Sequence, residues 1–236
     1  MPPSRRRRVA PLRVLLKKSG RPAWSDPANP SSPNVLTLTA VDPLPSRVEA
    51  LLHTWFGRPT EVGYDQPRPF WFRKDPQVDA HLRALFLEDY QDAAAGRLAD
   101  WQTCPLSCLA LVLLLDQIPR NCFRDQSQAF ATDSEALDVA RAALTQGFEQ
   151  QVTPVQAWFF YLPFEHSENL ADQEESVRRF RTLSLRHPAS ADTLDYAERH
   201  REVIARFGRF PHRNAILGRP STPAEMAYLA EPGTGF

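Results

Sequence analysis

The sequence predicts an all-α protein. After residue 44, apolar side chains recur at helical spacing, and N-cap residues followed by proline or by a capping box precede several of these stretches. No run of alternating β-branched residues is long enough to form a sheet. About eight helices are enough to bury one core, so we expect a single all-helical domain over residues 44–236.

The first two helices have clear signals at both ends. A helix is predicted to begin at Pro45 and to stop before Gly57. After a proline-rich loop, Asp75 is the expected N-cap of a second helix that begins with proline and ends at Gly96. Both glycines suit a helix end because they tolerate left-handed backbone.

The third predicted helix is the most apolar segment of the chain. It begins at Cys104-Pro105, and residues 108–115 are apolar on every side, which is typical of a buried central helix. Pro119 is expected to end it, because proline lacks the N–H that a helix needs.

The later helices are predicted from the same kinds of signal. The fourth begins with the capping box Thr132-Asp133-Ser134-Glu135 and ends at Gly147, and the fifth begins at Thr153-Pro154 and is stopped by Pro163. The sixth covers residues 169–186, and the seventh covers residues 190–206 and is ended by Gly208. The last helix follows Ser221-Thr222-Pro223-Ala224-Glu225.

Residues 1–43 differ from the rest of the chain. They are rich in proline, serine and arginine without an apolar period, so we expect a disordered basic tail. Three interpretations stay open: an organelle transit peptide, a tail with no targeting role, or an arm that binds nucleic acid or a membrane. The expected location is the cytoplasm, or an organelle matrix if the tail is a transit peptide.

Charge and composition restrict the partners. Lys+Arg and Asp+Glu are equal at 28 each, and eight of the basic residues lie in residues 1–25, so the rest of the chain is acidic by the same number. An acidic body argues against nucleic acid as the main partner. The longest apolar run, residues 108–115, is too short to span a bilayer. Three cysteines favour a reducing compartment over a disulfide scaffold, and the oligomeric state stays open.

Polar residues gather where two of the apolar helices stop. Asp116 follows the central helix, where the helix dipole disfavours a carboxylate, so it needs a cationic partner; Arg120 and Asn121 are close by. A structural Asp–Arg pair and a ligand or catalytic site both fit. Glu165-His166 follows the fifth helix and can form an acid–base pair, or the segment can simply cap the next helix. The spacing does not match a zinc site, so no metal is expected.

The third polar cluster is a basic segment. Four arginines and no acid lie between Val203 and Arg219. Arginine offers planar paired donors to a carboxylate or phosphate. These arginines can hold an anionic ligand, bind a protein partner, or pair internally with Asp116, Glu165 and Glu168.

Three segments resemble a known family: LLLDQIPRN, LPFEHSENLADQ and HREVIARFGRFPHRNAILGR. Together with flanking motifs they are similar, over about residues 48–230, to the bacterial family catalogued as domain of unknown function 924. The resemblance implies an all-helical fold related to tetratricopeptide-like superhelices. It implies no settled activity, and the cofactors stay unknown.

We therefore expect a small-molecule site for an anionic ligand at the helix ends, in a protein that can be an enzyme using histidine and glutamate as acid–base groups. The alternative is a helical scaffold that binds a peptide or protein partner in its groove, with purely structural polar motifs. The candidate catalytic residues are Asp116, Glu165, His166 and His212, and the candidate ligand-binding residues are Arg120, Asn121, His200, Arg206, Arg209, Arg213, Asn214 and Arg219.

Overall fold

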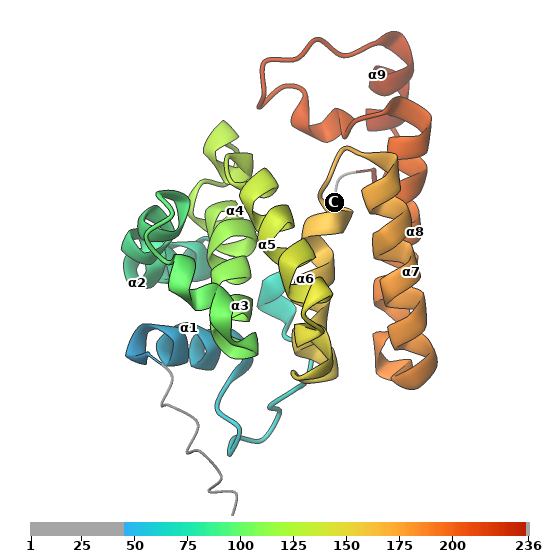
Figure 1. Ribbon diagram of the computed structural model, residues 1–236. Helices are drawn as coiled ribbons and strands as arrows, with labels where there is room; N and C mark the ends of the chain where they lie inside the picture. The colour runs from blue at the N-terminus through green and yellow to red at the C-terminus, as the bar shows by residue number, and fades with distance from the viewer. Residues whose placement is uncertain (1–44, 235–236) are drawn as a thin grey trace, which may run out of the picture. The chain divides into compact units, whose positions relative to one another are not determined.

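The computed structural model describes residues 45–234, and every regular element in that range is helical, which confirms the all-α prediction (Figure 1). The predicted tail, residues 1–43, lies outside the described residues. Short 3₁₀ turns join the α-helices, which are α1 Ser46–Phe56, α2 Pro76–Ala94, α3 Pro105–Val112, α4 Ile118–Cys122, α5 Asp133–Thr145, α6 Pro154–Glu165, α7 Leu170–Arg186, α8 Ala191–Phe207 and α9 Pro223–Leu229.

Most predicted helix starts are confirmed by their caps. The Asp75 carboxylate accepts hydrogen bonds from the backbone N–H groups of the first turn of α2. Thr153 and Thr222 each form a full capping box, at the starts of α6 and α9. Gly208 adopts left-handed backbone after α8, as expected for a helix end.

The capping box predicted at Thr132 is wrong. Thr132 does precede α5, but its side chain makes no cap hydrogen bond. Its hydroxyl instead donates to the backbone carbonyl of Leu115, at 2.6 Å. The Thr132 hydroxyl therefore bonds to a distant backbone carbonyl instead of to the first turn of its own helix.

The prediction that Pro119 ends the central helix is also wrong. Helical backbone runs through α3, a wider π-helical turn at Leu113–Gln117, and α4. In the wide turn the N–H of Ile118 donates to the carbonyl of Leu113, five residues back. The next residue, Pro119, has no N–H for the carbonyl of Leu115, and the Thr132 hydroxyl takes that place. π-turns of this kind are frequent at functional sites.

Pro163 does not stop the fifth predicted helix either. It lies inside α6, which continues to Glu165. Every residue of α6 from Val155 to Glu165 is buried, and the helix packs against α5 and α7 (Figure 1). This packing outweighs the lost hydrogen bond. As a result α6 carries Glu165, and His166 directly after it, deep into the domain.

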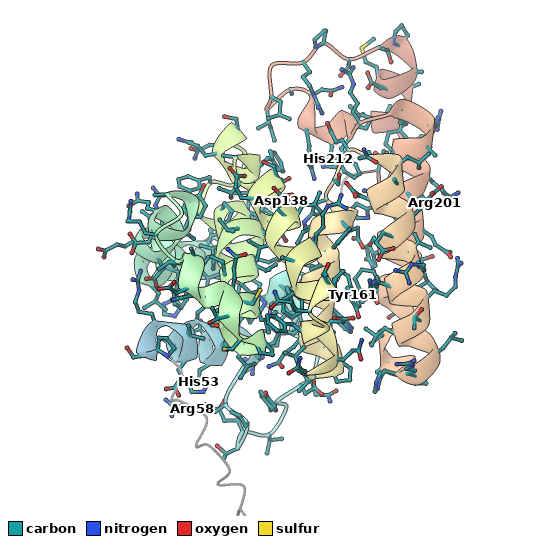
Figure 2. All side chains as sticks on the ribbon, in the orientation of Figure 1. His53, Arg58, Asp138, Tyr161, Arg201 and His212 are labelled. Atoms are coloured by element: carbon teal, nitrogen blue, oxygen red, sulfur yellow. The ribbon has the colours of Figure 1, made fainter. Side chains whose placement is uncertain are left out.

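The core contains an aromatic cluster. The ring centroid of Phe159 lies 5.0 Å from that of Trp71 and 5.8 Å from that of Trp55. Tyr161 of α6 packs edge-on against Phe180 of α7, with centroids 5.3 Å apart, and side chains fill the space between the ribbons (Figure 2). This apolar packing supplies most of the stability and holds the helix ends in place.

A second, smaller apolar cluster holds the C-terminal part of the chain. It is built on Val203, Ile204 and Phe210, with Phe207 and Tyr228 partly buried against it. The tetratricopeptide-like arrangement stays a prediction. Within residues 45–234, no helix is long and apolar enough to cross a membrane.

Candidate functional site

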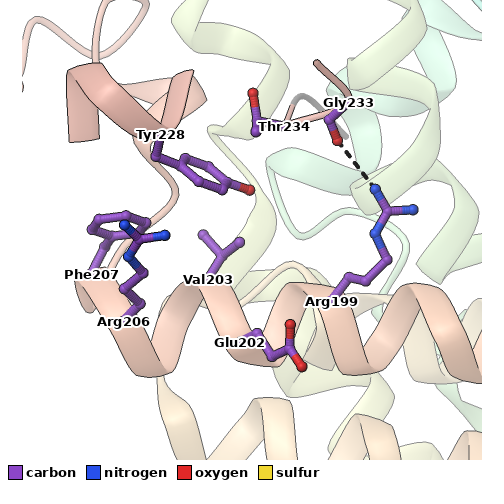
Figure 3. A pocket seen from close by; sticks show the side chains of 8 residues that line it. All are labelled: Arg199, Glu202, Val203, Arg206, Phe207, Tyr228, Gly233 and Thr234. Atoms are coloured by element: carbon purple, nitrogen blue, oxygen red, sulfur yellow. Dashed lines mark hydrogen bonds between the residues drawn. The ribbon is translucent and has the colours of Figure 1, made fainter. Parts of the chain in front are cut away.

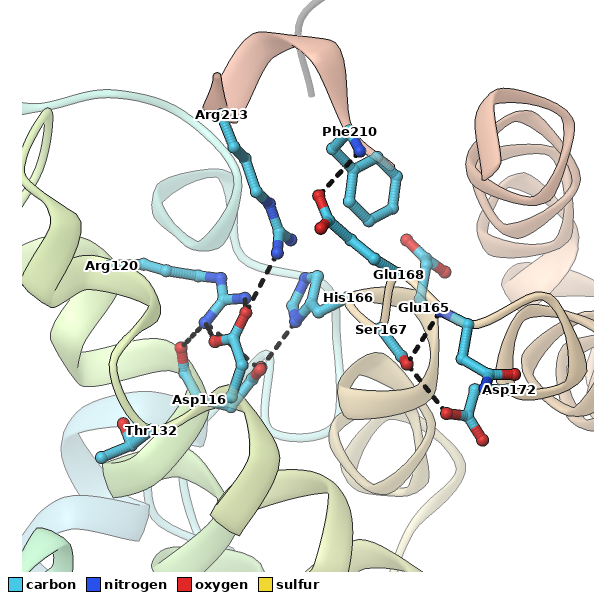
Figure 4. A network of polar contacts seen from close by, with 12 residues as sticks. Asp116, Arg120, Thr132, Glu165, His166, Ser167, Glu168, Asp172, Phe210 and Arg213 are labelled. Carbon is cyan, nitrogen blue, oxygen red and sulfur yellow. Dashed lines mark hydrogen bonds and ion pairs between the residues drawn. The ribbon is translucent and has the colours of Figure 1, made fainter. Parts of the chain in front are cut away.

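The structure brings side chains from all three polar clusters to one place (Figure 4). They surround a cavity of about 380 Å³. Its walls come from the π-turn and α4, the end of α6, α8, the 3₁₀ turn Pro211–Arg213 and the loop before α2. The lining residues are Trp71, Phe72, Arg73, Gln117, Arg120, Asn121, Arg124, Asp125, Ala129, Phe130, His166, His200, His212, Arg213 and Ile216.

Asp116 is the buried carboxylate behind the cavity wall, with 1% of its surface exposed. One oxygen accepts from His166 Nδ1 at 2.7 Å and lies 3.3 Å from Arg120 Nη1; the other accepts from Gln117 Nε2 at 2.6 Å. Burial alone would raise the pKa of Asp116, but Arg120, His166 and Gln117 outweigh it and hold that pKa below its usual value. The predicted arginine neighbour of Asp116 is thus confirmed as Arg120.

A second carboxylate, Asp133, joins two arginines. Its oxygens accept from Arg120 Nη1 and Nη2 at 2.9 and 3.1 Å, and from Arg213 Nη1 at 3.2 Å. Asp133 is the first residue of α5 and directly follows Thr132, whose hydroxyl donates a hydrogen bond to the π-turn. Residues 132 and 133 therefore fix both the turn and the two guanidinium groups.

Arg213 is the least satisfied charge in the site. It is 6% exposed, and its guanidinium lies between the rings of Phe130 and Phe210, 4.6 and 4.5 Å from their centroids. Its buried Nε has no hydrogen-bond partner among the described residues. Burial lowers the pKa of Arg213 to about 10, more than Asp133 compensates. The ion pair with Asp133 therefore leaves part of the cost of burying this cation uncompensated.

The three histidines of the cavity are neutral at pH 7. His166 donates from Nδ1 to Asp116, so its Nε2 is the acceptor, and burial together with Arg120 lowers its pKa. His200 donates from Nδ1 to the carbonyl of Tyr196 at 2.8 Å, and burial lowers its pKa to about 3. Burial and then Arg213 lower the pKa of His212 to about 4.

Glu165 is a buried carboxyl beside the cavity. One of its oxygens lies 3.3 Å from His200 Nδ1, and it is 4% exposed. Burial, and then repulsion from Asp116, raise its pKa to about 8. Asp116 and Glu165 thus hold opposite protonation states at neutral pH, a pattern typical of acid–base sites.

Several predicted ligand-binding residues lie elsewhere. Arg209 pairs with Glu225 at 2.6 and 2.8 Å, and Arg219 pairs with Glu168 at 2.6 and 2.9 Å. Asn214 bonds to Arg219 and to Ser221 beside them. Asn121 lines the cavity, but its amide donates to Asp79.

Arg206 lies at a different cavity, of about 270 Å³, between α8 and α9 (Figure 3). Its guanidinium stacks on Phe207, 4.7 Å from the ring centroid. Of the four arginines in the basic segment, Arg213 is the one that lines the site cavity among the described residues. Of the internal pairs expected for this segment, the one with Glu168 forms, whereas the described partners of Asp116 and Glu165 are Arg120, His166 and His200.

Sequence reasoning missed two essential parts of the site. Asp133 was assigned to a capping box, because an acid directly after a threonine carries no local signal that would mark it as a site residue. Phe130, which holds Arg213, lies in a 3₁₀ turn with nothing in its sequence to mark it. Within residues 45–234, no three His, Cys, Asp or Glu side chains are arranged to hold a metal ion.

Fold and site together describe an all-helical protein with a cavity at its helix ends that buried polar side chains help to line. A family model described as "Bacterial protein of unknown function (DUF924)" matches residues 51–233, so the chain belongs to this family. It is similar to a solved structure of a protein of unknown function from Agrobacterium tumefaciens, with 43% identity over 68% of this chain and 88% of that chain, and a TM-score of 0.62. No functionally curated protein matches the chain.

Proposed function

We propose that the cavity binds a small anionic molecule and that His166 exchanges a proton with it. The observation that carries the proposal is Arg213: a guanidinium held between two aromatic rings, buried beside a cavity, with an Nε that lacks a partner among the described residues. The ion pair of Arg213 with Asp133 does not offset the cost of its burial, so an anion in the cavity would lower the free energy of the folded state.

The acid–base role rests on the Asp116–His166 pair. A carboxylate that accepts from Nδ1 holds the imidazole in one tautomer and leaves Nε2 as a base, and His166 lines the cavity. His200 and His212 line the same cavity and can exchange protons there as well. Residues from all three polar clusters line one cavity, which favours a small-molecule site over a peptide-binding groove.

Thermal unfolding with a panel of anions tests the proposal. Acetate, benzoate, phosphate and sulfate are each compared with chloride at equal ionic strength. At one hundred times its dissociation constant, a ligand stabilises the native state by about 2.7 kcal/mol, so at least one of these anions should raise the melting temperature clearly.

Two variants separate the site from general salt effects. Arg213→Gln should abolish the gain, and Arg206→Gln, on an arginine away from the cavity, should keep it. If Arg213→Gln does not fold, Arg213→Lys, which keeps the charge without the planar donors, should weaken binding instead. An anion effect that is absent in the wild type, or unchanged in Arg213→Gln or Arg213→Lys, would contradict the proposal.

A further inference from the structure

The charges around the cavity limit what it can hold. Arg120 and Arg213 are balanced by Asp116 and Asp133 in one connected network. At the cavity mouth, Arg124 pairs with Asp79.

Lys74 and Asp125 form a further balanced pair at the mouth. Arg73, an exposed lining residue, makes no ion pair with the described residues. Since the three lining histidines are neutral at pH 7, the surroundings offer one uncompensated positive charge.

Apart from the amides of Gln117 and Asn121, the rest of the lining is apolar and largely aromatic. Trp71, Phe72 and Phe130 contribute rings, and Ala129 and Ile216 add aliphatic surface. Phe72 is 62% exposed at the rim, so its ring is available to a molecule in the cavity. A volume of about 380 Å³ lies at the small end of the range for ligand pockets.

We infer that the ligand is an organic monocarboxylate with a flat apolar body: its carboxylate meets the edge of the Arg213 guanidinium, and its body lies against Trp71 and Phe72. This inference rests on the proposed function and adds the ligand class. Phe130 and Phe210 both pack against the guanidinium, and its Nη1 already donates to Asp133; the N–H groups on the edge of a guanidinium are the part that matches a carboxylate. A dianion such as phosphate brings more charge than the surroundings can neutralise.

Binding measurements with matched probes test the ligand class. Benzoate, acetate, inorganic phosphate and neutral benzamide are titrated into the full chain at pH 7.5 and followed by NMR. We expect benzoate to bind about tenfold or more tightly than acetate, because the ring adds apolar contact. Phosphate should bind no more tightly than acetate, and benzamide should not bind.

A rim variant gives a second readout. Phe72→Ala removes an exposed ring, so the fold should be kept, and the affinity for benzoate should fall while that for acetate stays the same. Val62→Ala, another exposed apolar residue, is the control and should change neither affinity.

The outcomes separate this inference from the proposed function. If phosphate binds more tightly than benzoate and Arg213→Gln abolishes it, the anion site stands and the monocarboxylate class is wrong. Equal affinities for benzoate and acetate, or a Phe72→Ala variant that binds benzoate normally, would also overturn the ligand class. If no probe binds, both proposals fail.

Discussion

Two neighbouring regions use the same residue types in different ways. In the first, which we name the clasp (Glu168, Arg209, Arg219 and Glu225), each arginine forms paired hydrogen bonds to a single carboxylate. Glu168 also accepts from the N–H of Phe210 at 2.8 Å. Charges and hydrogen bonds are both matched there, as expected for a structural element.

In the second region, the cavity, the charges are matched but the hydrogen bonds are not. Arg213 has a buried Nε without a partner, and one oxygen of Glu165 is likewise buried and unpartnered among the described residues. Native proteins rarely leave buried polar atoms unsatisfied. We therefore assign a stabilising role to the clasp and ligand binding to the cavity.

The largest effect is expected at Asp116, where the cavity network meets the core. Asp116→Ala removes a buried carboxylate from Arg120 and His166, and breaking a buried pair of this kind costs about 3–5 kcal/mol. Urea unfolding measures the loss. Asp138→Ala, at an exposed site on α5, is the control and should change stability by less than about 0.5 kcal/mol. A small effect at Asp116 would mean that the network does not support the fold.

The clasp should show a smaller loss that leaves anion binding intact. Glu168→Gln weakens the two bonds from Arg219, and hydrogen bonds to charged groups are worth about 1.5–3 kcal/mol. We expect about 2 kcal/mol in urea unfolding, with the anion effect retained. Glu174→Gln, an exposed residue on α7, is the matched control. Loss of anion binding in Glu168→Gln would contradict the assignment of separate roles to the clasp and the cavity.

Glu165 gives the cavity its own pH dependence. Its pKa is about 8 in the folded protein against an ordinary value of 4.5, so the folded state holds more protons between these values and stability falls as pH rises through that window. The cavity histidines, whose pKa values are lowered, act in the opposite direction just above pH 6.5, because the unfolded chain still binds protons there. The Glu165 contribution itself falls by about 2 kcal/mol from pH 6.5 to 8, and urea unfolding of the wild type and of Glu165→Gln over this range measures it as a difference.

The Glu165→Gln variant isolates this contribution. Glutamine cannot ionise, so the variant should lack this loss and keep only the gain from the histidines. A variant whose stability changes with pH as that of the wild type does would show that Glu165 is not the group that titrates.

The smallest effect is expected at Arg206. It is exposed and stacks on Phe207 and Tyr228, and contacts of this kind are worth about 0.5–1 kcal/mol at exposed sites. Arg206→Gln should lower the free energy of unfolding by no more than that amount. A larger loss would indicate that the basic segment is stabilised in a way the clasp does not explain.

Much of the fold could be predicted from local signals, and the site only in part. Asp75 and Thr222 are caps whose partners lie within three residues, so pattern reading finds them. Thr132 was misread because its partner, Leu115, lies 17 residues away, and Pro119 and Pro163 were misread because long-range contacts compensate for the lost bonds.

The arginines illustrate the limit for the site. Arg213 reaches a carboxylate 80 positions earlier, and Arg219 one 51 positions earlier, in a segment where all four arginines look alike. Which arginine faces the cavity depends on packing around Phe130 and Phe210, which no local pattern encodes. The sequence therefore predicted an arginine-rich anion site but could not select Arg213.

The most direct test of the central claim is the NMR signal of the Arg213 Nε–H group, assigned by its loss in Arg213→Lys. The proposed site predicts that this signal shifts on titration with benzoate, along a saturating curve, because an anion binds beside the guanidinium that carries the Nε–H group. The Nε–H signals of Arg209, which donates to Glu225, and of Arg219, which donates to the side-chain oxygen of Asn214, should stay in place. An Arg213 signal that does not move with benzoate, acetate or phosphate would contradict the account.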